Sequence, residues 1–154
     1  MPELPEVETV RRGLARHLAH FHIAKIKISR ERAIASPGGV DLFIKQMLNK
    51  TIGNWERRGK YLIASMHAEQ NKDSKRKTNL LPQGWWVVHL RMTGYFEYQP
   101  NLIKACPYTR VQFWDKEGNE LRFVDTRSFG QMWWIDSSSS PEKAIKSINN
   151  LGPE

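Results

Sequence analysis

Residues 1–18 read MPELPEVETVRRGLARHL and combine a reactive N-terminal motif with a helical pattern. Removal of Met1 would leave Pro2 as a terminal secondary amine, which can attack an electrophilic carbon and form an iminium ion. Glu3 and Glu6 follow closely, so two carboxylates stand where they can move protons. The same residues also suit an ordinary helix start, because proline lacks the N–H that would stay unpaired there and glutamate favours the positive end of the dipole. The motif alone leaves both interpretations open.

Hydrophobic periodicity predicts two helices followed by a series of strands. Apolar residues recur at helical spacing in segments 5–18 and 40–48. Alternation predicts a half-buried strand at 24–28, and from Thr51 onward the sequence reads as strands at 51–57, 60–67, 85–90, 95–98, 109–115, 119–126 and 130–135. We therefore expect an α+β fold, mainly β, in which an antiparallel β-sandwich is flanked by two α-helices. Four tryptophans lie in strand-like runs, where we expect them in the core or on a sheet face: Trp85, Trp86, Trp133 and Trp134.

Two segments interrupt this pattern. Residues 68–84 are polar and basic, so we expect a surface loop whose charges are either solvated or in contact with phosphate. Residues 137–140 are four serines that read as a linker, and Ser140 with Pro141 predicts the capped start of a helix that ends near Gly152. Because we expect nothing for this helix to pack on, we predict that residues 1–136 form one domain and that residues 137–154 lead into a second.

Composition and charge narrow the possible functions. A chain of 154 residues that is 40% hydrophobic and 26% charged can form a folded core. The formal net charge of +8 favours a polyanionic partner, although many basic proteins never bind nucleic acid. The single cysteine, Cys106, excludes an internal disulfide and a cysteine-rich zinc module within this chain. No stretch has the length of a membrane span or the core of a signal peptide, so we expect no membrane partner and a soluble intracellular protein, cytoplasmic or associated with the nucleoid.

Four separated segments carry residues suited to nucleic-acid chemistry: PELPEVE at 2–8, RGKY at 58–61, HLRMTG at 89–94 and DTRSFG at 125–130. Together they resemble the N-terminal domain of the formamidopyrimidine-DNA glycosylases, in the family shared with endonuclease VIII. Leu4 favours the formamidopyrimidine branch, because the other branch typically has glycine there. The resemblance implies a monomeric DNA repair enzyme, a glycosylase and AP lyase that removes oxidised purines such as 8-oxoguanine and formamidopyrimidines from double-stranded DNA.

The resemblance also implies roles for individual residues. Pro2 would be the nucleophile that attacks C1′ of the damaged nucleotide, Glu3 would transfer protons around the sugar, and Glu6 would hold the terminal amine and the sugar. Lys60, grouped with these catalytic residues, would bind the phosphate beside the lesion, and His89 would be a second phosphate contact. Met92, Arg127 and Phe129 would fill the gap left by the flipped base. Among them, Arg127 would pair with the orphaned partner base.

Taken one at a time, these residues also have ordinary structural explanations. A lysine at a strand end, as at Lys60, is usually solvated, and a methionine beside a turn, as at Met92, usually belongs to the turn or the core edge. His89 lies between two apolar residues and is compatible with a hydrogen-bonded, partly buried histidine. Phe129 is compatible with a core position. Only the four segments together favour the functional interpretation.

The chain departs from the family pattern in its length. Family members continue into a helix–two-turn–helix domain and a four-cysteine zinc finger, so the family's structural zinc site lies outside these residues and we expect no metal or other cofactor within them. Ser128 stands where a basic residue is usual. Two alternatives to an oxidised-purine glycosylase therefore stay open. One is a truncated DNA-binding module with weak or no catalysis, and the other is an enzyme that prefers oxidised pyrimidines.

Overall fold

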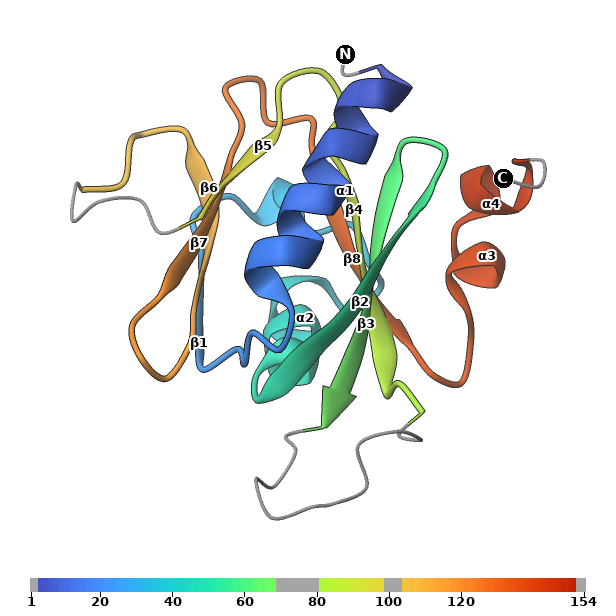
Figure 1. Cartoon of the computed structure of the whole chain (residues 1–154), viewed down its shortest axis with the longest axis horizontal. Helices are drawn as coiled ribbons and strands as arrows, with labels where there is room; N and C mark the ends of the chain where they lie inside the picture. The colour runs from blue at the N-terminus through green and yellow to red at the C-terminus, as the bar shows by residue number, and fades with distance from the viewer. Residues whose placement is uncertain (1–2, 69–80, 99–103, 152–154) are drawn as a thin grey trace.

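The structure is a computed structural model of the chain and describes residues 3–68, 81–98 and 104–151. Within these residues, eight strands form two four-stranded antiparallel sheets (Figure 1). The first sheet has the order β2-β3-β4-β8, with bounds β2 (Lys50–Arg58), β3 (Tyr61–Ala68), β4 (Gly84–His89) and β8 (Gln131–Asp136). The second has the order β1-β6-β7-β5, with bounds β1 (Lys25–Ile28), β6 (Thr109–Trp114), β7 (Glu120–Val124) and β5 (Tyr95–Tyr98).

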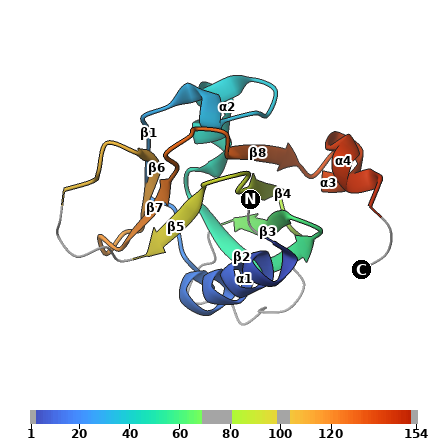
Figure 2. The same ribbon diagram turned by 90° about the horizontal axis from the view of Figure 1, so that it is seen from above.

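Two longer helices close the space between the sheets. Seen from above in Figure 2, α1 (Leu4–Leu18) and α2 (Gly39–Met47) lie on opposite sides of that space. The apolar stripe of α1 packs toward β2 and buries Val7, Leu14 and Leu18. A short 3₁₀ turn, η1 (Glu31–Ala33), precedes α2. The predicted mainly-β sandwich with two flanking helices is confirmed, and each predicted strand agrees with the structure to within two residues at either end.

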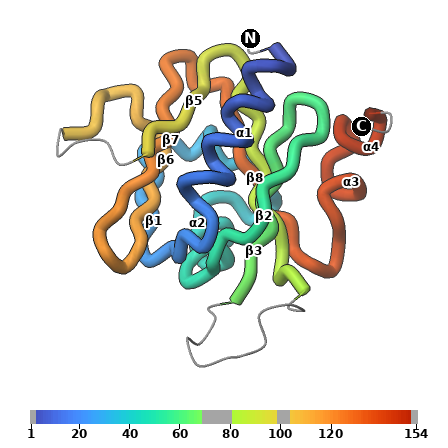
Figure 3. The backbone as a smooth tube through the Cα atoms, viewed as in Figure 1, coloured from blue at the N-terminus to red at the C-terminus, as the bar shows by residue number. Residues whose placement is uncertain are grey.

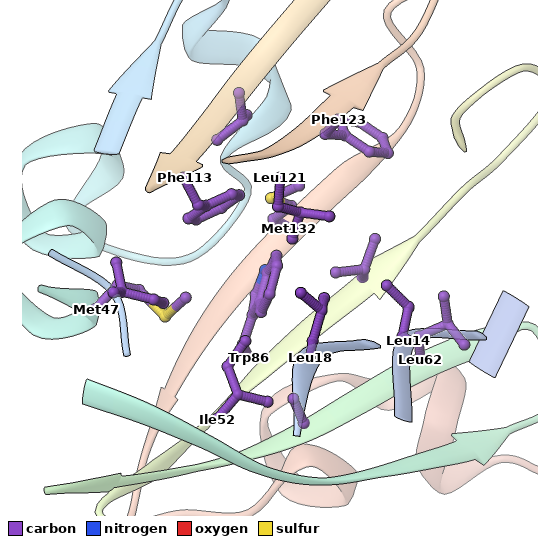
Figure 4. Packing of buried hydrophobic residues seen from close by; sticks show 14 of the residues in the cluster. Leu14, Leu18, Met47, Ile52, Leu62, Trp86, Phe113, Leu121, Phe123 and Met132 are labelled. Carbon is purple, nitrogen blue, oxygen red and sulfur yellow. The ribbon is translucent and has the colours of Figure 1, made fainter. Parts of the chain in front are cut away.

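The main core lies between the two sheets and is built around an aromatic cluster (Figure 4). Trp86 on β4 is fully buried, and its ring lies 4.7 Å from that of Phe113 on β6 and 5.3 Å from that of Trp55 on β2. Trp134 is also buried, whereas Trp85 and Trp133 pack on the opposite face of the first sheet. The tryptophans of the strand-like runs are therefore core and sheet-face residues, as predicted.

The C-terminal segment differs from its prediction. Instead of one helix there are two short ones, α3 (Pro141–Ala144) and α4 (Lys146–Asn149), separated by Ile145 in an extended conformation. Isoleucine is β-branched and has a lower helix propensity than unbranched residues, so leaving the helical conformation at Ile145 costs little. Ser140 caps α3 as expected, accepting the N–H of Lys143 at 3.3 Å.

The expectation that this segment has nothing to pack on is wrong. Ile145 and Ile148 are buried against the outer face of the first sheet, in a second cluster with Tyr61, Ile63 and Ile135. Arg58 at the end of β2 also pairs with Glu142 at 3.2 Å. The tube in Figure 3 shows the segment following the first sheet along one side. Of the predicted basic loop 68–84, residues 69–80 lie outside the described residues, as do the lysines and arginine on which a phosphate contact was considered.

Candidate functional site

The four singled-out segments meet at one edge of the molecule. The strand register explains this, because Tyr61 pairs with His89 and His89 pairs with Gln131 across β3, β4 and β8. The β2–β3 turn, the β4–β5 loop and the β7–β8 loop therefore leave the sheets at the same end. Figure 1 shows these three connections and the start of α1 along the upper edge.

The start of α1 presents two acidic side chains to solvent. Pro2 lies outside the described residues. Glu3 precedes the helix in an extended conformation, and its carbonyl accepts the N–H groups of Glu6 and Val7, both at 3.0 Å. The side chains of Glu3 and Glu6 are exposed, so both are open to a ligand at the helix N-terminus. The helix interpretation of this motif is thus correct, and it leaves the carboxylates free for the functional one.

A cluster of charges fastens α1 to the neighbouring hairpin. Glu8 accepts hydrogen bonds from Arg11 at 2.7 Å, from Arg12 at 3.0 Å and from Arg57 of β2 at 3.2 Å. Arg57 in turn donates to the carbonyl of Gly59 in the β2–β3 turn at 3.0 Å. The hydrogen bond from Arg11 above all, together with those from Arg12 and Arg57, lowers the pKa of Glu8 from 4.5 to about 2. We call Glu8, Arg11, Arg12 and Arg57 the Glu8 clamp.

Lys60 occupies a tight turn rather than the first position of a strand. β2 ends at Arg58 and β3 begins at Tyr61, so only Gly59 and Lys60 connect them. Gly59 has a φ of +57°, and glycine at the first of two turn residues matches the twist of a hairpin. Lys60 is partly exposed at the tip. The Glu8 clamp therefore links the acidic start of α1 to the turn that carries this lysine.

His89 lies at the end of β4 and is buried, with only 5% of its surface exposed. Its Nδ1 accepts the N–H of Arg91 at 3.0 Å, and its ring packs edge-on against Tyr61 at 4.7 Å. Burial, followed by the charges of Arg91 and Lys60, lowers the pKa of His89 from 6.5 to about 4. The ring is therefore neutral near pH 7, and Nε2–H is its remaining donor. This placement matches the alternative of a hydrogen-bonded buried histidine, and a phosphate contact stays a prediction.

Three exposed side chains project from the two neighbouring loops. Met92 in the β4–β5 loop is 43% exposed, and Phe129 in the β7–β8 loop is 42% exposed. Arg127, two residues before Phe129 in the same loop, is also exposed. Phe129 is therefore not a core residue. The guanidinium of Arg32 in η1 lies 5.1 Å from the centre of the Phe129 ring, a cation–π contact. Two large apolar side chains and two arginines, Arg32 and Arg127, are thus exposed at this edge, which makes it a candidate contact surface.

A buried carboxylate connects these two loops. Asp125 is 1% exposed and accepts hydrogen bonds from Thr93, from the N–H of Arg127 and from the N–H of Gly130. Sequence reasoning quoted Asp125 and Thr93 within two motifs without giving either a role. An aspartate that ends a strand, just before a loop bearing arginine and phenylalanine, is the signal that would have singled it out. The contact of Arg57 with Glu8 and that of Arg32 with Phe129 were missed because these partners are distant in sequence.

Two cavities lined by described residues lie away from this edge. One, of about 360 Å³, is lined by residues of α1, β5 and β7, among them Leu14, Phe96 and Leu121. Another, of about 310 Å³, lies on β2 and β3 beside Ser65 and His67. Across the described part of the chain, no group of three or more histidine, cysteine or acidic side chains gathers to hold a metal ion. The edge itself carries exposed side chains on two loops, an arrangement that can meet a macromolecular surface.

Comparison with known proteins gives consistent relatives. A family model described as the formamidopyrimidine-DNA glycosylase N-terminal domain matches residues 1–132. The formamidopyrimidine-DNA glycosylase of Prochlorococcus marinus strain MIT 9313 is 55% identical over 154 residues, which are 100% of this chain and 53% of that protein. The solved complex of Lactococcus lactis Fpg with DNA containing FAPY-dG has a TM-score of 0.72 at 28% identity and covers 88% of this chain and 45% of that one.

A second Lactococcus lactis structure, of wild-type Fpg with DNA containing an oxidised pyrimidine, also has a TM-score of 0.72 at 28% identity, over 89% of this chain and 45% of that one. The chain thus spans about half the length of the curated relatives it matches. Among the described residues, no helix is long and apolar enough to cross a membrane.

Proposed function

The chain belongs to the formamidopyrimidine-DNA glycosylase family, and from that premise we propose that it carries the nucleophile and the DNA-facing loops of a base-excision repair enzyme. The proposed activity is that of a glycosylase and AP lyase on oxidised purines in double-stranded DNA. The observation that supports it most is the shared edge, where the start of α1, the Lys60 turn and three exposed side chains of two loops lie together. A net charge of +8 favours the same partner.

In the proposed reaction, the terminal amine of Pro2 attacks C1′ of the damaged nucleotide and the bond from C1′ to the base breaks. The base leaves with the electron pair of that bond and takes up a proton. The amine loses its proton as the sugar ring opens to an iminium ion, and Glu3 and Glu6, both exposed at the start of α1, are the proposed carriers of these protons. The iminium acidifies the hydrogens on C2′, so loss of one of them expels the 3′ phosphate and cuts the strand.

The exposed side chains have a matching role in opening the duplex. Chemistry at C1′ requires the damaged nucleotide outside the base stack, which costs a few kcal/mol. An apolar wedge offsets part of this cost by replacing the lost stacking, and Met92 and Phe129 have the exposure for it. Arg127 has donors for the edge of the unpaired base. Lys60 at the turn tip, and His89 through Nε2–H, are the proposed phosphate contacts.

A second candidate function is a DNA-binding module with weak or no catalysis. The specific observation behind it is the net charge of +8, which is enough for binding to DNA without catalysis. Such a module would bind damaged and undamaged duplex equally, with a steep dependence on salt and no covalent product. Preference for oxidised pyrimidines rather than purines is a question of substrate within the first proposal, and excision of thymine glycol against 8-oxoguanine decides it.

The test is borohydride trapping of the chain on a duplex that carries one 8-oxoguanine. After intact-mass measurement has shown that Met1 is absent, we expect a covalent protein–DNA band with the wild type and none with the same chain retaining Met1, in which the nitrogen of Pro2 is an amide and cannot form the iminium ion. Equal bands would overturn the role of Pro2. Absence of any band, with binding that ignores the lesion, would favour the non-catalytic module.

A further inference from the structure

The two loops that carry the exposed side chains share one buried anchor. Oδ1 of Asp125 accepts the hydroxyl of Thr93, from the β4–β5 loop, and the N–H of Arg127 at 3.3 Å. Oδ2 of the same carboxylate accepts the N–H of Gly130 at 2.7 Å. The Arg127 N–H also lies 3.2 Å from the hydroxyl oxygen of Thr93. A single side chain therefore ties the Met92 loop to both ends of the Arg127–Phe129 loop.

We propose that Asp125 and Thr93 form a positioning clasp that holds the two wedge loops as one rigid unit, so that Met92 and Phe129 enter the duplex together. Neither residue touches the reacting atoms in this proposal. Both act through the side chains they position, and the inference rests on the proposed function of the wedge.

The close packing around the clasp supports a rigid unit. A side chain at Gly130 would place its Cβ 2.5 Å from the Phe123 ring and 2.9 Å from Oδ2 of Asp125, so only glycine lets this N–H reach the carboxylate. Gly94 is similar, since a Cβ there would lie 2.7 Å from the carbonyl oxygen of Leu90 and 2.8 Å from Phe123. Both loops thus close on the same phenylalanine ring.

The backbone of each loop also needs an external hold. Arg91 has a φ of +54° and Ser128 a φ of +57°, and residues other than glycine rarely adopt this left-handed conformation. One strained residue lies in each loop, next to Met92 and between Arg127 and Phe129. Such conformations persist where surrounding contacts over-determine them. The charged acceptor of the clasp, which is buried and shared by both loops, supplies such contacts.

Rigidity matters here because the wedge must act from an exposed position. Exposed side chains on loops lose conformational freedom when they insert into a duplex, and holding the loops in the inserted arrangement beforehand lowers that cost. Loss of the clasp should therefore lower activity on a duplex, from which the damaged nucleotide must be flipped out. Activity on a single strand, where no base pair has to be opened, should stay the same. This difference separates a positioning role from a merely structural one.

The experiment compares Thr93→Val with the wild type on two substrates. Valine keeps the shape of threonine and removes the hydroxyl donor, while the two backbone donors to Asp125 remain. Thr51→Val is the matched control, since Thr51 also makes one side-chain hydrogen bond, with His22 at 3.2 Å, but lies on β2 away from the loops. The substrates are a duplex with one 8-oxoguanine and a single strand with one abasic site. Fluorescence of 2-aminopurine next to the lesion reports unstacking.

We expect Thr93→Val to lower trapping and 2-aminopurine unstacking on the duplex about tenfold, the scale of one lost hydrogen bond to a charged acceptor, with trapping on the abasic single strand unchanged. The control should match the wild type on both. Asp125→Asn replaces one carboxylate oxygen, which accepts hydrogen bonds, with an NH₂ group that faces the same donors. It should therefore lower trapping and unstacking on the duplex further, and thermal unfolding checks that this variant is folded.

If Thr93→Val lowered trapping equally on both substrates, or lowered neither trapping nor unstacking on the duplex, the clasp proposal would be wrong. A wild type that unstacks the duplex without trapping would overturn the catalytic proposal alone, and the fluorescence would still decide the clasp. A wild type that neither traps nor unstacks would overturn both.

Discussion

Lys60 has its position set by the backbone of its own turn. Two strands end beside it, Gly59 supplies the left-handed residue that the turn requires, and Arg57 holds the carbonyl of Gly59. The ammonium group therefore stands at a fixed edge of the sheet, close to the start of α1. A lysine that contacts phosphate adds to affinity through the release of counterions, and this contribution does not depend on base sequence.

We predict that Lys60→Ala weakens DNA binding and lowers the slope of log K against log salt by about 1, the change for one lost phosphate contact. Lys45→Ala is the control, because Lys45 is exposed in the last turn of α2, which lies below the upper edge of the molecule in Figure 1. Titration of a labelled duplex at several salt concentrations measures both. Equal slopes for the two variants would remove Lys60 from the interface.

At the residue scale, the sequence could indicate the surroundings of some side chains and left two environments open for others. Met92 and Phe129 were expected at the surface only through their motifs, and both are exposed. The phosphate contact expected of His89 stays a prediction, and the register that pairs His89 with Tyr61 also buries its ring. Its alternation with Val88 and Leu90 already allowed that outcome. The partners of Asp125 lie in another loop, which no local pattern could reveal.

At the scale of elements, the Glu8 clamp joins a helix to a hairpin that begins more than forty residues later in the chain. The direction in which pH changes the stability contributed by the clamp follows from the pKa of Glu8. This pKa is about 2 in the folded protein, against an ordinary value of 4.5. The unfolded chain therefore binds more protons between these values. The stability that the clamp contributes is complete above about pH 4.5 and is lost as the pH falls toward 2.

We predict that Glu8→Gln lowers the free energy of unfolding at pH 7 and flattens its fall between pH 4.5 and 2, because the amide has no proton to gain. Urea unfolding at pH 7, 4.5 and 3 measures this. Glu56→Gln, at an exposed position on β2, is the control and should retain the wild-type slope. A Glu8→Gln variant that loses stability with acid as steeply as the wild type would show that other groups control the acid limb.

Element boundaries were predicted well because each strand is a short run rich in strand-forming residues, which tertiary contacts reinforced. The first sheet is an example, since β4 pairs along its length with both β3 and β8. The segment after residue 136 was predicted less well. The helix start at Ser140 and Pro141 was predicted correctly. The break at Ile145 was not, because Ile145 packs on a sheet face formed by residues far away in the sequence.

For the whole molecule, this C-terminal segment determines whether the fold is one cooperative body. Ile148 is fully buried on the outer face of the first sheet, and a Cβ at Gly59 would lie 2.8 Å from the side chain of Leu151. Arg58 pairs with Glu142 beside the same turn. The segment therefore braces the hairpin that presents Lys60, although sequence analysis placed a domain boundary at residue 136.

We predict that Ile148→Ala costs about 2–5 kcal/mol of unfolding free energy, the range for truncating a fully buried isoleucine. Ser147→Ala, at an exposed neighbouring position, should stay within about 0.5 kcal/mol of the wild type. Thermal unfolding followed by tryptophan fluorescence and by far-ultraviolet circular dichroism measures both variants. Coincident single transitions, shifted down for Ile148→Ala, indicate that residues 3–151 unfold together. An early transition confined to the dichroism signal, with the fluorescence transition unmoved, would instead mean that α3 and α4 detach alone and that the boundary at residue 136 is real.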